Sequence, residues 1–131
     1  MKTFAAAIDA LPDPSDPAYA ERAAVILADL RQLEGVVARA ARQSRGMPAI
    51  VMALSTVRKR HEELMFQAAA APNATLGQRL FAARRRANLS AGETGNAVGL
   101  SAQLIEAVEA GQPVTDEDAA AISAFLAQLG G

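Results

Sequence analysis

Two stretches in the first half of the chain carry apolar residues at alternating spacings of four and three. The first stretch follows Asp16–Pro17, a typical helix start, because aspartate caps free amides and proline fits the first helical turn. Its apolar positions are Tyr19, Ala23, Ile26, Leu30, Leu33, Val37 and Ala40. Those of the second stretch are Met47, Ile50, Leu54, Val57, Leu64 and Ala68, with His61 at one position. The pattern predicts two long helices, each with one coiled-coil-like stripe.

A helical hairpin over residues 16–70 is the expected arrangement of these helices. Gly46 and Pro48 interrupt the pattern between them, because glycine permits a left-handed helix end and proline disfavours helix before itself. Small side chains bury little surface, so the hairpin is expected to dimerise or to pack on the rest of the chain; the alternative is a hairpin that folds back on its own domain. The predicted dimerisation residues are Ile26, Leu30, Leu33, Val37, Ile50, Leu54, Val57 and Leu64. Residues 1–15 are expected to form a flexible N-terminal segment.

Capping residues divide the chain from Thr75 onward into short helices. Three serine or threonine residues are followed three positions later by Gln, Glu or Asp, the spacing of a capping box or of its acidic variant. These pairs are Thr75–Gln78, Ser90–Glu93 and Thr115–Asp118, and Ser101 can cap a further helix. The predicted helices lie near 76–87, 91–98, 102–110 and 116–128, and the last is either one helix or two. Since such short helices are not stable singly, residues 75–131 are expected to form a compact four- to five-helix domain.

Composition agrees with an all-α fold and narrows the cellular setting. Hydrophobic residues make up 51% of the 131 residues, many of them alanine, and aromatic residues only 4%. The chain contains no cysteine, which excludes disulfides, thiolate metal sites and thiol chemistry. No apolar run approaches the roughly 20 residues of a membrane span, and Asp9 interrupts a stretch that faintly resembles a signal peptide. We therefore expect a cytoplasmic protein without a membrane partner.

Charge is distributed unevenly along the chain. Residues 35–86 contain ten Lys or Arg and two Glu, whereas residues 87–131 contain six Asp or Glu and no Lys or Arg. A basic block of this kind attracts a polyanion or simply forms solvated helix faces, and charge alone leaves both readings open.

A series of residues from Leu76 to Gly111 keeps a fixed spacing. Its members are Leu76, Gly77, Arg79, Leu80, Leu89, Ser90, Gly99, Leu100, Ser101, Ile105, Val108, Glu109 and Gly111. The series resembles the phage-repressor and Cro-like (XRE-type) helix-turn-helix family over about residues 76–129. This resemblance implies a lambda-repressor-like domain and a bacterial regulator of transcription that binds DNA as a dimer.

The resemblance also implies which residues meet DNA. The helix after Ser101 would enter the major groove, where Gln103 is suited to pair with adenine and Ala102 or Leu104 to contact a thymine methyl. The groove-facing positions would be Ser101, Ala102, Gln103, Leu104 and Ala107. Phosphate contacts would come from the basic residues of the preceding helix or from those of the hairpin. The former are Arg79, Arg84, Arg85 and Arg86, which are otherwise a solvated face.

The chain departs from the family pattern in its second short helix. Ala91 stands where family members often have a phosphate-binding glutamine, and Gly95 where they pack alanine. Gly92 lies in the same helix, and each glycine costs about 0.5–1 kcal/mol of helix stability relative to alanine. The helix is therefore either frayed or unusually closely packed.

Three classes of function remain at this level. The first is a DNA-binding transcriptional regulator that acts as a homodimer and associates with the nucleoid. The alternative is a degenerate helix-turn-helix that binds a protein, such as RNA polymerase or another regulator. An enzyme is not expected, because no acid, base and nucleophile converge, and His61 on an apolar stripe is typical of a core-edge residue rather than a ligand. No metal and no cofactor are expected.

Overall fold

Seven helices make up the part of the chain that the structure describes. The computed structural model describes the backbone of residues 2–43 and 47–130, and side chains from residue 6 onward within these ranges. The helices are α1 (Lys2–Asp9), α2 (Tyr19–Gln43), α3 (Pro48–Ala69), α4 (Leu76–Arg86), α5 (Ala91–Val98), α6 (Ala102–Glu109) and α7 (Asp116–Gln128). Within these ranges the chain forms no strand, so the all-α fold class is confirmed. No described helix has the length and apolar character that crossing a membrane requires.

The chain divides between α3 and α4 into two compact units. Unit 1 comprises residues 1–72 and unit 2 comprises residues 73–131. Unit 1 contains α1 to α3, and unit 2 contains α4 to α7.

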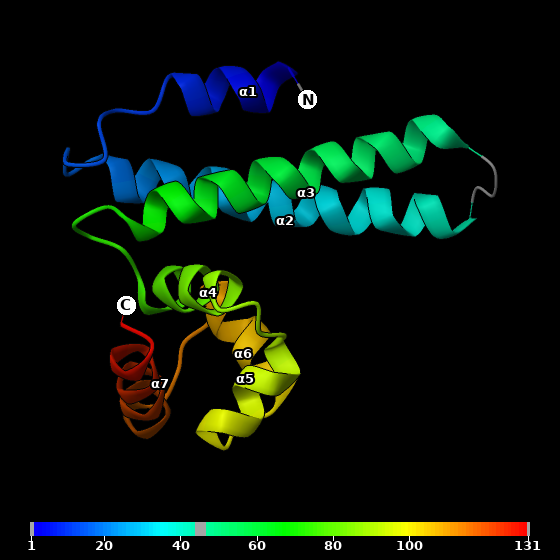
Figure 1. The fold of residues 1–131 in the computed structure, drawn as a ribbon. Coiled ribbons are helices and arrows are strands. Elements are labelled where there is room, and N and C mark those ends of the chain that lie inside the picture. Colours follow the sequence, from blue (N-terminus) through cyan, green and yellow to red (C-terminus); the bar gives the residue numbers. More distant parts are fainter. Residues whose placement is uncertain (1, 44–46, 131) are drawn as a thin grey trace. The chain divides into compact units, whose positions relative to one another are not determined.

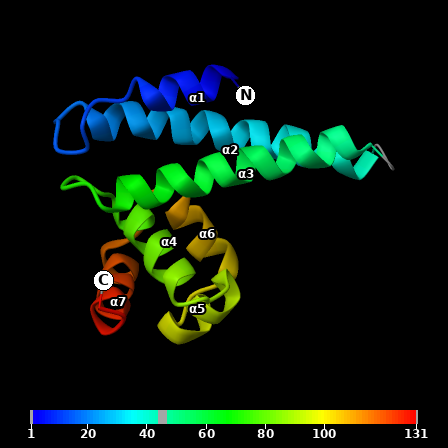
Figure 2. The ribbon, with the colours of Figure 1, turned by 45° about the horizontal axis from the view of Figure 1, so that its top comes forward.

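In unit 1, α2 and α3 lie side by side along their length, and α1 packs against α2 (Figures 1 and 2). The predicted apolar stripes supply much of the buried surface of these helices. The buried residues are Tyr19, Ala23, Ile26, Leu27, Leu30, Ala38, Val57, Leu64, Met65 and Ala68. Met47, predicted at the head of the second stripe, is half exposed and precedes the first turn of α3.

Burial within the chain limits how much of the predicted dimerisation surface could meet a second copy. Among the eight residues predicted for that surface, Ile26, Leu30, Val57 and Leu64 are at most 8% exposed. The other four are partly buried: Leu33, Val37, Ile50 and Leu54. A side chain that is packed inside its own chain has little surface left for a second copy. The four buried residues therefore pack within the chain itself, and pairing of two copies through the rest of the stripes stays a prediction.

The segment before α2 also differs from the sequence prediction. Residues 1–15 include α1, an alanine-rich helix that contacts α2, where a flexible segment was expected. Helix α2 begins at Tyr19, and the Asp16 carboxylate accepts a hydrogen bond from the Ala18 amide at 2.8 Å in the turn before it. The predicted helix stop at residues 44–48 falls partly on 44–46, which lie outside the described residues.

In unit 2, the predicted caps are confirmed. Thr75 and Ser90 form complete capping boxes, with the side chains of Gln78 and Glu93 accepting from the cap amides at 3.0 and 2.8 Å. The hydroxyls of Ser101 and Thr115 accept from amides three residues later, at 3.1 and 3.2 Å. The helices end within one residue of the predicted positions, and the last one is a single helix.

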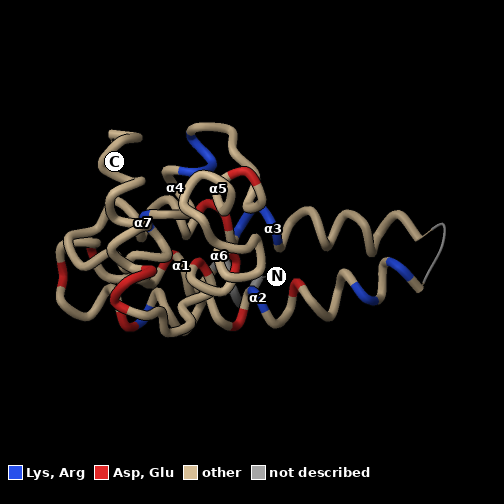
Figure 3. Tube along the Cα trace, turned by 90° about the horizontal axis from the view of Figure 1, so that it is seen from below, with Lys and Arg blue, Asp and Glu red and all other residues tan. Residues whose placement is uncertain are grey.

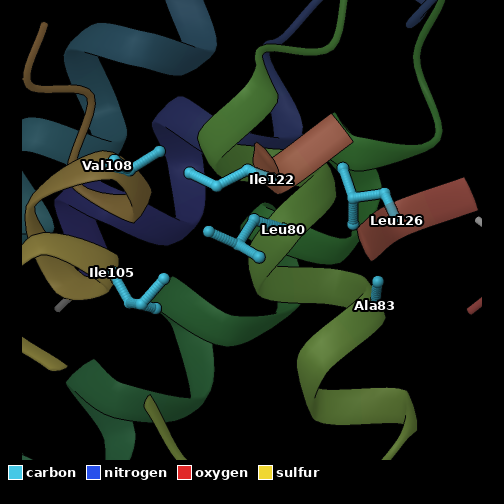
Figure 4. Close-up of a cluster of buried hydrophobic side chains, with 6 residues drawn as sticks. All are labelled: Leu80, Ala83, Ile105, Val108, Ile122 and Leu126. Carbon is cyan, nitrogen blue, oxygen red and sulfur yellow. The ribbon is translucent and has the colours of Figure 1, made fainter. Parts of the chain in front are cut away.

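The core of unit 2 is built from α4, α6 and α7 (Figure 4). Its buried side chains are Leu80, Ala83, Ile105, Val108, Ile122 and Leu126. In Figure 4, side chains of α6 and α7 gather around Leu80 of α4, so these three short helices support one another. Residues of α5 and of the turn after it, including Val98 and Leu100, pack at the edge of this cluster.

Two glycines permit close helix approaches in unit 2. A Cβ added at Gly77 would overlap the Val108 carbonyl oxygen, and one added at Gly95 would overlap that of Leu100. Gly92 has no such constraint, since its added Cβ would meet only the Ser90 hydroxyl at 3.8 Å. Of the two alternatives for α5, close packing is therefore the one that the structure supports.

His61 of unit 1 has a strongly shifted pKa. Burial lowers the pKa of His61 to about 4, and the charge of Arg31 adds to this shift against the opposing charges of Glu34 and Glu62. The imidazole is therefore neutral at neutral pH. This agrees with a histidine at the edge of the core.

We predict that His61 makes stability fall in mildly acidic solution. Because its folded-state pKa lies below its ordinary value of 6.5, the unfolded chain binds the extra proton between pH 6.5 and about 4. The free energy of unfolding should decrease by roughly 1–3 kcal/mol across this window as pH falls. Urea denaturation at several pH values measures it. His61→Gln should flatten the profile, and parallel profiles for the two proteins would contradict the prediction.

We also predict opposite effects for two alanine substitutions in α5. Gly95→Ala should lower the free energy of unfolding by about 2 kcal/mol or more, because its Cβ meets rigid backbone. Gly92→Ala, three residues earlier, should raise it by about 0.5–1 kcal/mol, because alanine favours helix where there is space. Thermal and urea unfolding of both variants provide the comparison. Equal changes in the free energy of unfolding for the two variants would show that the close contact at Gly95 does not exclude a larger residue.

Candidate nucleic-acid interface

A tight turn connects α5 to α6. Gly99 ends α5 in the left-handed conformation, with φ of 79°, and the Leu100 amide donates to the Gly95 carbonyl at 2.8 Å. Ser101 then caps α6 directly, so two residues separate the turn glycine from the next helix. Helices α5 and α6 contact each other closely as a result (Figure 2).

Helix α6 has one buried side and one exposed side. Ile105 and Val108 are 0% and 3% exposed and belong to the core of unit 2. Gln103 is exposed, so its amide can reach an external ligand. Ser101 is also exposed, although its hydroxyl already accepts the Leu104 amide.

The remaining predicted groove-facing residues offer less surface. Ala102, Leu104 and Ala107 are each partly buried. Leu104 packs against the hydrophobic core of unit 2, which limits its ability to cover a thymine methyl. Gln103 is therefore the predicted base-contacting residue that the structure leaves most available.

Arg84 is not available to a phosphate, which corrects its predicted role. Its guanidinium donates two hydrogen bonds to the Glu109 carboxylate, at 2.7 and 2.8 Å, and a third to the Leu89 carbonyl at 3.0 Å. Arg84 and Glu109 are only 9% and 8% exposed. The hydrogen bonds to Glu109 raise the pKa of Arg84, so its guanidinium remains charged. Arg84 thus joins α4 to α6 instead of facing solvent.

Sequence reasoning missed this ion pair, although a signal was present. Arg84 lies four residues after the buried Leu80, and Glu109 lies four residues after the buried Ile105. Residues four apart share a helix face, so both charged side chains start from the core side of their helices. Two opposite charges on facing apolar stripes indicate a buried pair rather than a solvated face.

The other three basic residues of α4 are exposed. Arg79, Arg85 and Arg86 are the members of the predicted phosphate-contacting set that reach solvent. The Arg85 guanidinium lies over the Phe81 ring, 5.6 Å from its centre, and Arg84 lies 5.7 Å from the same ring. A cation held against an aromatic face keeps its charge while losing conformational freedom.

A hollow of about 540 Å³ lies where α4 ends and α5 begins. Arg85 and Asn88 line it, but so do the carboxylates of Glu93 and Glu106. The hydrogen bond from the Ser90 amide lowers the pKa of Glu93, which keeps this carboxylate negative at neutral pH. The hollow therefore combines both signs of charge and is not a simple anion pocket.

Metal ligands do not gather in the part of the chain that the structure describes. No group of three or more His, Cys, Asp or Glu side chains there could hold a metal ion. The acidic residues of α7, Asp116 to Asp118, follow the cap in the first turn, where they complement the helix dipole.

We predict that breaking the buried ion pair destabilises unit 2, whereas replacing both partners does not. Arg84→Met alone should lower the free energy of unfolding by about 3–5 kcal/mol, because it leaves the Glu109 carboxylate buried without its cation. Arg84→Met with Glu109→Leu should recover most of that loss. Urea denaturation measures the set, with Arg79→Met as the exposed control in the same helix. If Arg84→Met alone were as stable as Arg79→Met, the ion pair with Glu109 would have no structural role.

Comparison with known proteins places the chain in a family. It is 52% identical over 128 residues to a protein of Mycolicibacterium smegmatis that is named as uncharacterized, and the match covers 98% of this chain and 99% of the relative. No solved structure matches it. Residues 4–75 match the family model MSMEG_6518_N, described as an N-terminal domain, which covers α2, α3 and most of α1. The chain belongs to the MSMEG_6518_N family.

Proposed function

We propose that unit 2 binds duplex DNA with α6 in the major groove, as a transcriptional regulator of the phage-repressor and Cro-like (XRE-type) class. The observation that carries this proposal is the orientation of α6. Its buried side is fixed by Ile105 and Val108, and its exposed side presents Gln103 beside the turn at Gly99. A short helix held in this way after a tight turn is suited to enter the groove. The proposed location is the cytoplasm, in association with the nucleoid.

Attraction to phosphate comes from α4 in this proposal. Arg79, Arg85 and Arg86 are exposed, whereas no Lys or Arg occurs in residues 87–131. Cation contacts to phosphates supply most of the affinity of such proteins and make it fall with salt. Arg84 is engaged by Glu109, and the exposed cations of α4 are Arg79, Arg85 and Arg86. A single copy should therefore bind weakly, and two copies on one duplex would raise affinity through effective concentration.

Direct base contacts are few in this arrangement. Gln103 can make a bidentate contact with adenine, and the other exposed position of α6 is the acidic Glu106. Sequence preference would then depend in part on the shape of the duplex.

A second candidate, binding of a protein, is favoured by the acidic side chains beside α6. Glu93 and Glu106 line the same hollow as Arg85, and like charges there oppose a phosphate. A basic partner surface, such as one on RNA polymerase or another regulator, would instead be attracted. Added salt weakens binding in both cases, and the two candidates differ in how steeply affinity falls with salt concentration. The fall is steeper for DNA binding.

We predict that the exposed arginines of α4 control DNA affinity. Arg85→Glu with Arg86→Glu should weaken binding to random duplexes roughly tenfold or more and lower the salt dependence, because about two phosphate contacts are lost. Gln103→Ala should leave binding to random duplexes nearly unchanged and reduce only preference among genomic duplexes. Titrations of fluorescent duplexes with the full chain at several salt concentrations measure all three proteins.

Arg42→Glu with Lys59→Glu is the matched control. Both residues are exposed in unit 1, and the change in net charge is the same. An equal loss of affinity in the two double variants would assign the attraction to overall charge and not to α4. Absence of duplex binding by the unmodified chain at low salt would rule out the proposed function.

A further inference from the structure

Helix α2 carries a second regular seam on the side opposite its buried stripe. The residues of this outer face recur at spacings of three and four, and each of them is exposed. They are Glu21, Val25, Ala28, Gln32, Val36, Arg39 and Gln43. With two successive spacings of four between Ala28 and Val36, the pattern is that of an eleven-residue helical contact repeat. We call it the outer seam of α2.

Two valines make the outer seam unusual for a solvated helix face. Val25 and Val36 are 59% and 52% exposed and lie eleven residues apart, which returns to nearly the same angle after three turns. Val25 and Val36 are the only large apolar residues of α2 with this exposure among those that the structure describes. They therefore mark one continuous line along the helix.

The charges at the two ends of the outer seam have opposite sign. Glu21 lies one turn before Val25, and Arg39 lies three residues after Val36. Figure 3 shows basic residues in the last turns of α2, and the sequence places Arg39 and Arg42 there. The order among the residues of the outer seam is acid, valine, small or neutral residues, valine, base, while the exposed Arg22 and Asp29 flank the seam. When a second copy of the helix runs in the opposite direction, each valine meets a valine and each acidic end meets a basic end.

We propose that the outer seam of α2 binds the outer seam of a second copy of this chain in antiparallel orientation. Val25 of one copy then lies against Val36 of the other, and Glu21 against Arg39 of the other. A two-fold axis repeats each contact, as a closed symmetric dimer requires. The parallel arrangement would instead oppose Glu21 with Glu21 and Arg39 with Arg39, which charge repulsion disfavours.

This surface differs from the buried stripes that the sequence first suggested for dimerisation. The stripes hold α2 to α3 within the chain, and the outer seam lies on the remaining side of α2. With two valines per copy, the apolar area is small, so we expect a weak dimer. The proposal does not depend on DNA binding by unit 2, because it is tested without DNA.

Cysteine pairing tests the orientation directly, because the chain contains no cysteine. Val25→Cys and Val36→Cys are prepared as separate proteins and oxidised mildly, alone and mixed. Antiparallel pairing predicts a disulfide-linked dimer in the mixture and much less in either protein alone, since bonded Cα atoms lie within about 7 Å. Cross-linking of Val25→Cys alone, with none in the mixture, would overturn the proposal in favour of a parallel pair.

A charge exchange tests the same contact in solution. Sedimentation of the full chain over a range of concentrations should show a monomer–dimer equilibrium. Glu21→Arg or Arg39→Glu alone should weaken the dimer roughly tenfold, and the double variant should restore it, because each end again meets its opposite. Arg42→Glu, the same charge change beside the seam, is the control. A monomer at every concentration, or no restoration in the double variant, would refute the proposal.

Discussion

The ion pair between Arg84 and Glu109 is the constraint on which the candidate interface depends. It joins α4 to α6 through two short hydrogen bonds, and two bonds between planar groups fix rotation as well as distance. Ile105 and Val108 bury the adjacent side of α6 in the core. Together these contacts determine that Gln103 faces outward. The same pair removes one guanidinium from the basic surface of α4, so orientation of α6 is obtained at the cost of phosphate attraction.

Helix α2 shows how one sequence pattern can serve two kinds of packing. The stripe through Leu30 is buried within the chain, whereas the line through Val25 and Val36 is exposed. Both lines have helical spacing, so periodicity alone does not identify the partner of either. Hydrophobic strength decides which line is buried in the chain, because the inner stripe carries the leucines and isoleucine and the outer seam carries two valines among polar residues. The weaker seam is left for a weaker, intermolecular contact in our proposal.

Local signals made much of this fold predictable from sequence. The caps at Thr75, Ser90, Ser101 and Thr115 fix helix starts through contacts within three residues, and the structure contains all four. Contacts between distant residues were harder to predict. The sequence predicts an exposed Arg84 because charged side chains usually face solvent, and its partner lies 25 residues away. An apolar stripe shows that a helix packs, and not on what, so the hairpin stripes are compatible with a second copy and with the rest of the chain.

The two proposals together imply a steep dependence on protein concentration. If unit 2 attracts DNA with the few exposed cations of α4, one copy binds weakly, and useful affinity requires two copies on one duplex. If the outer seam of α2 supplies the pairing, that step is weak as well, because it buries two valines per copy. Dimer formation and DNA binding are then two weak equilibria in series. At low concentration, the fraction of DNA sites occupied rises with about the square of the chain concentration. A regulator built in this way would respond to its own abundance without binding a small effector.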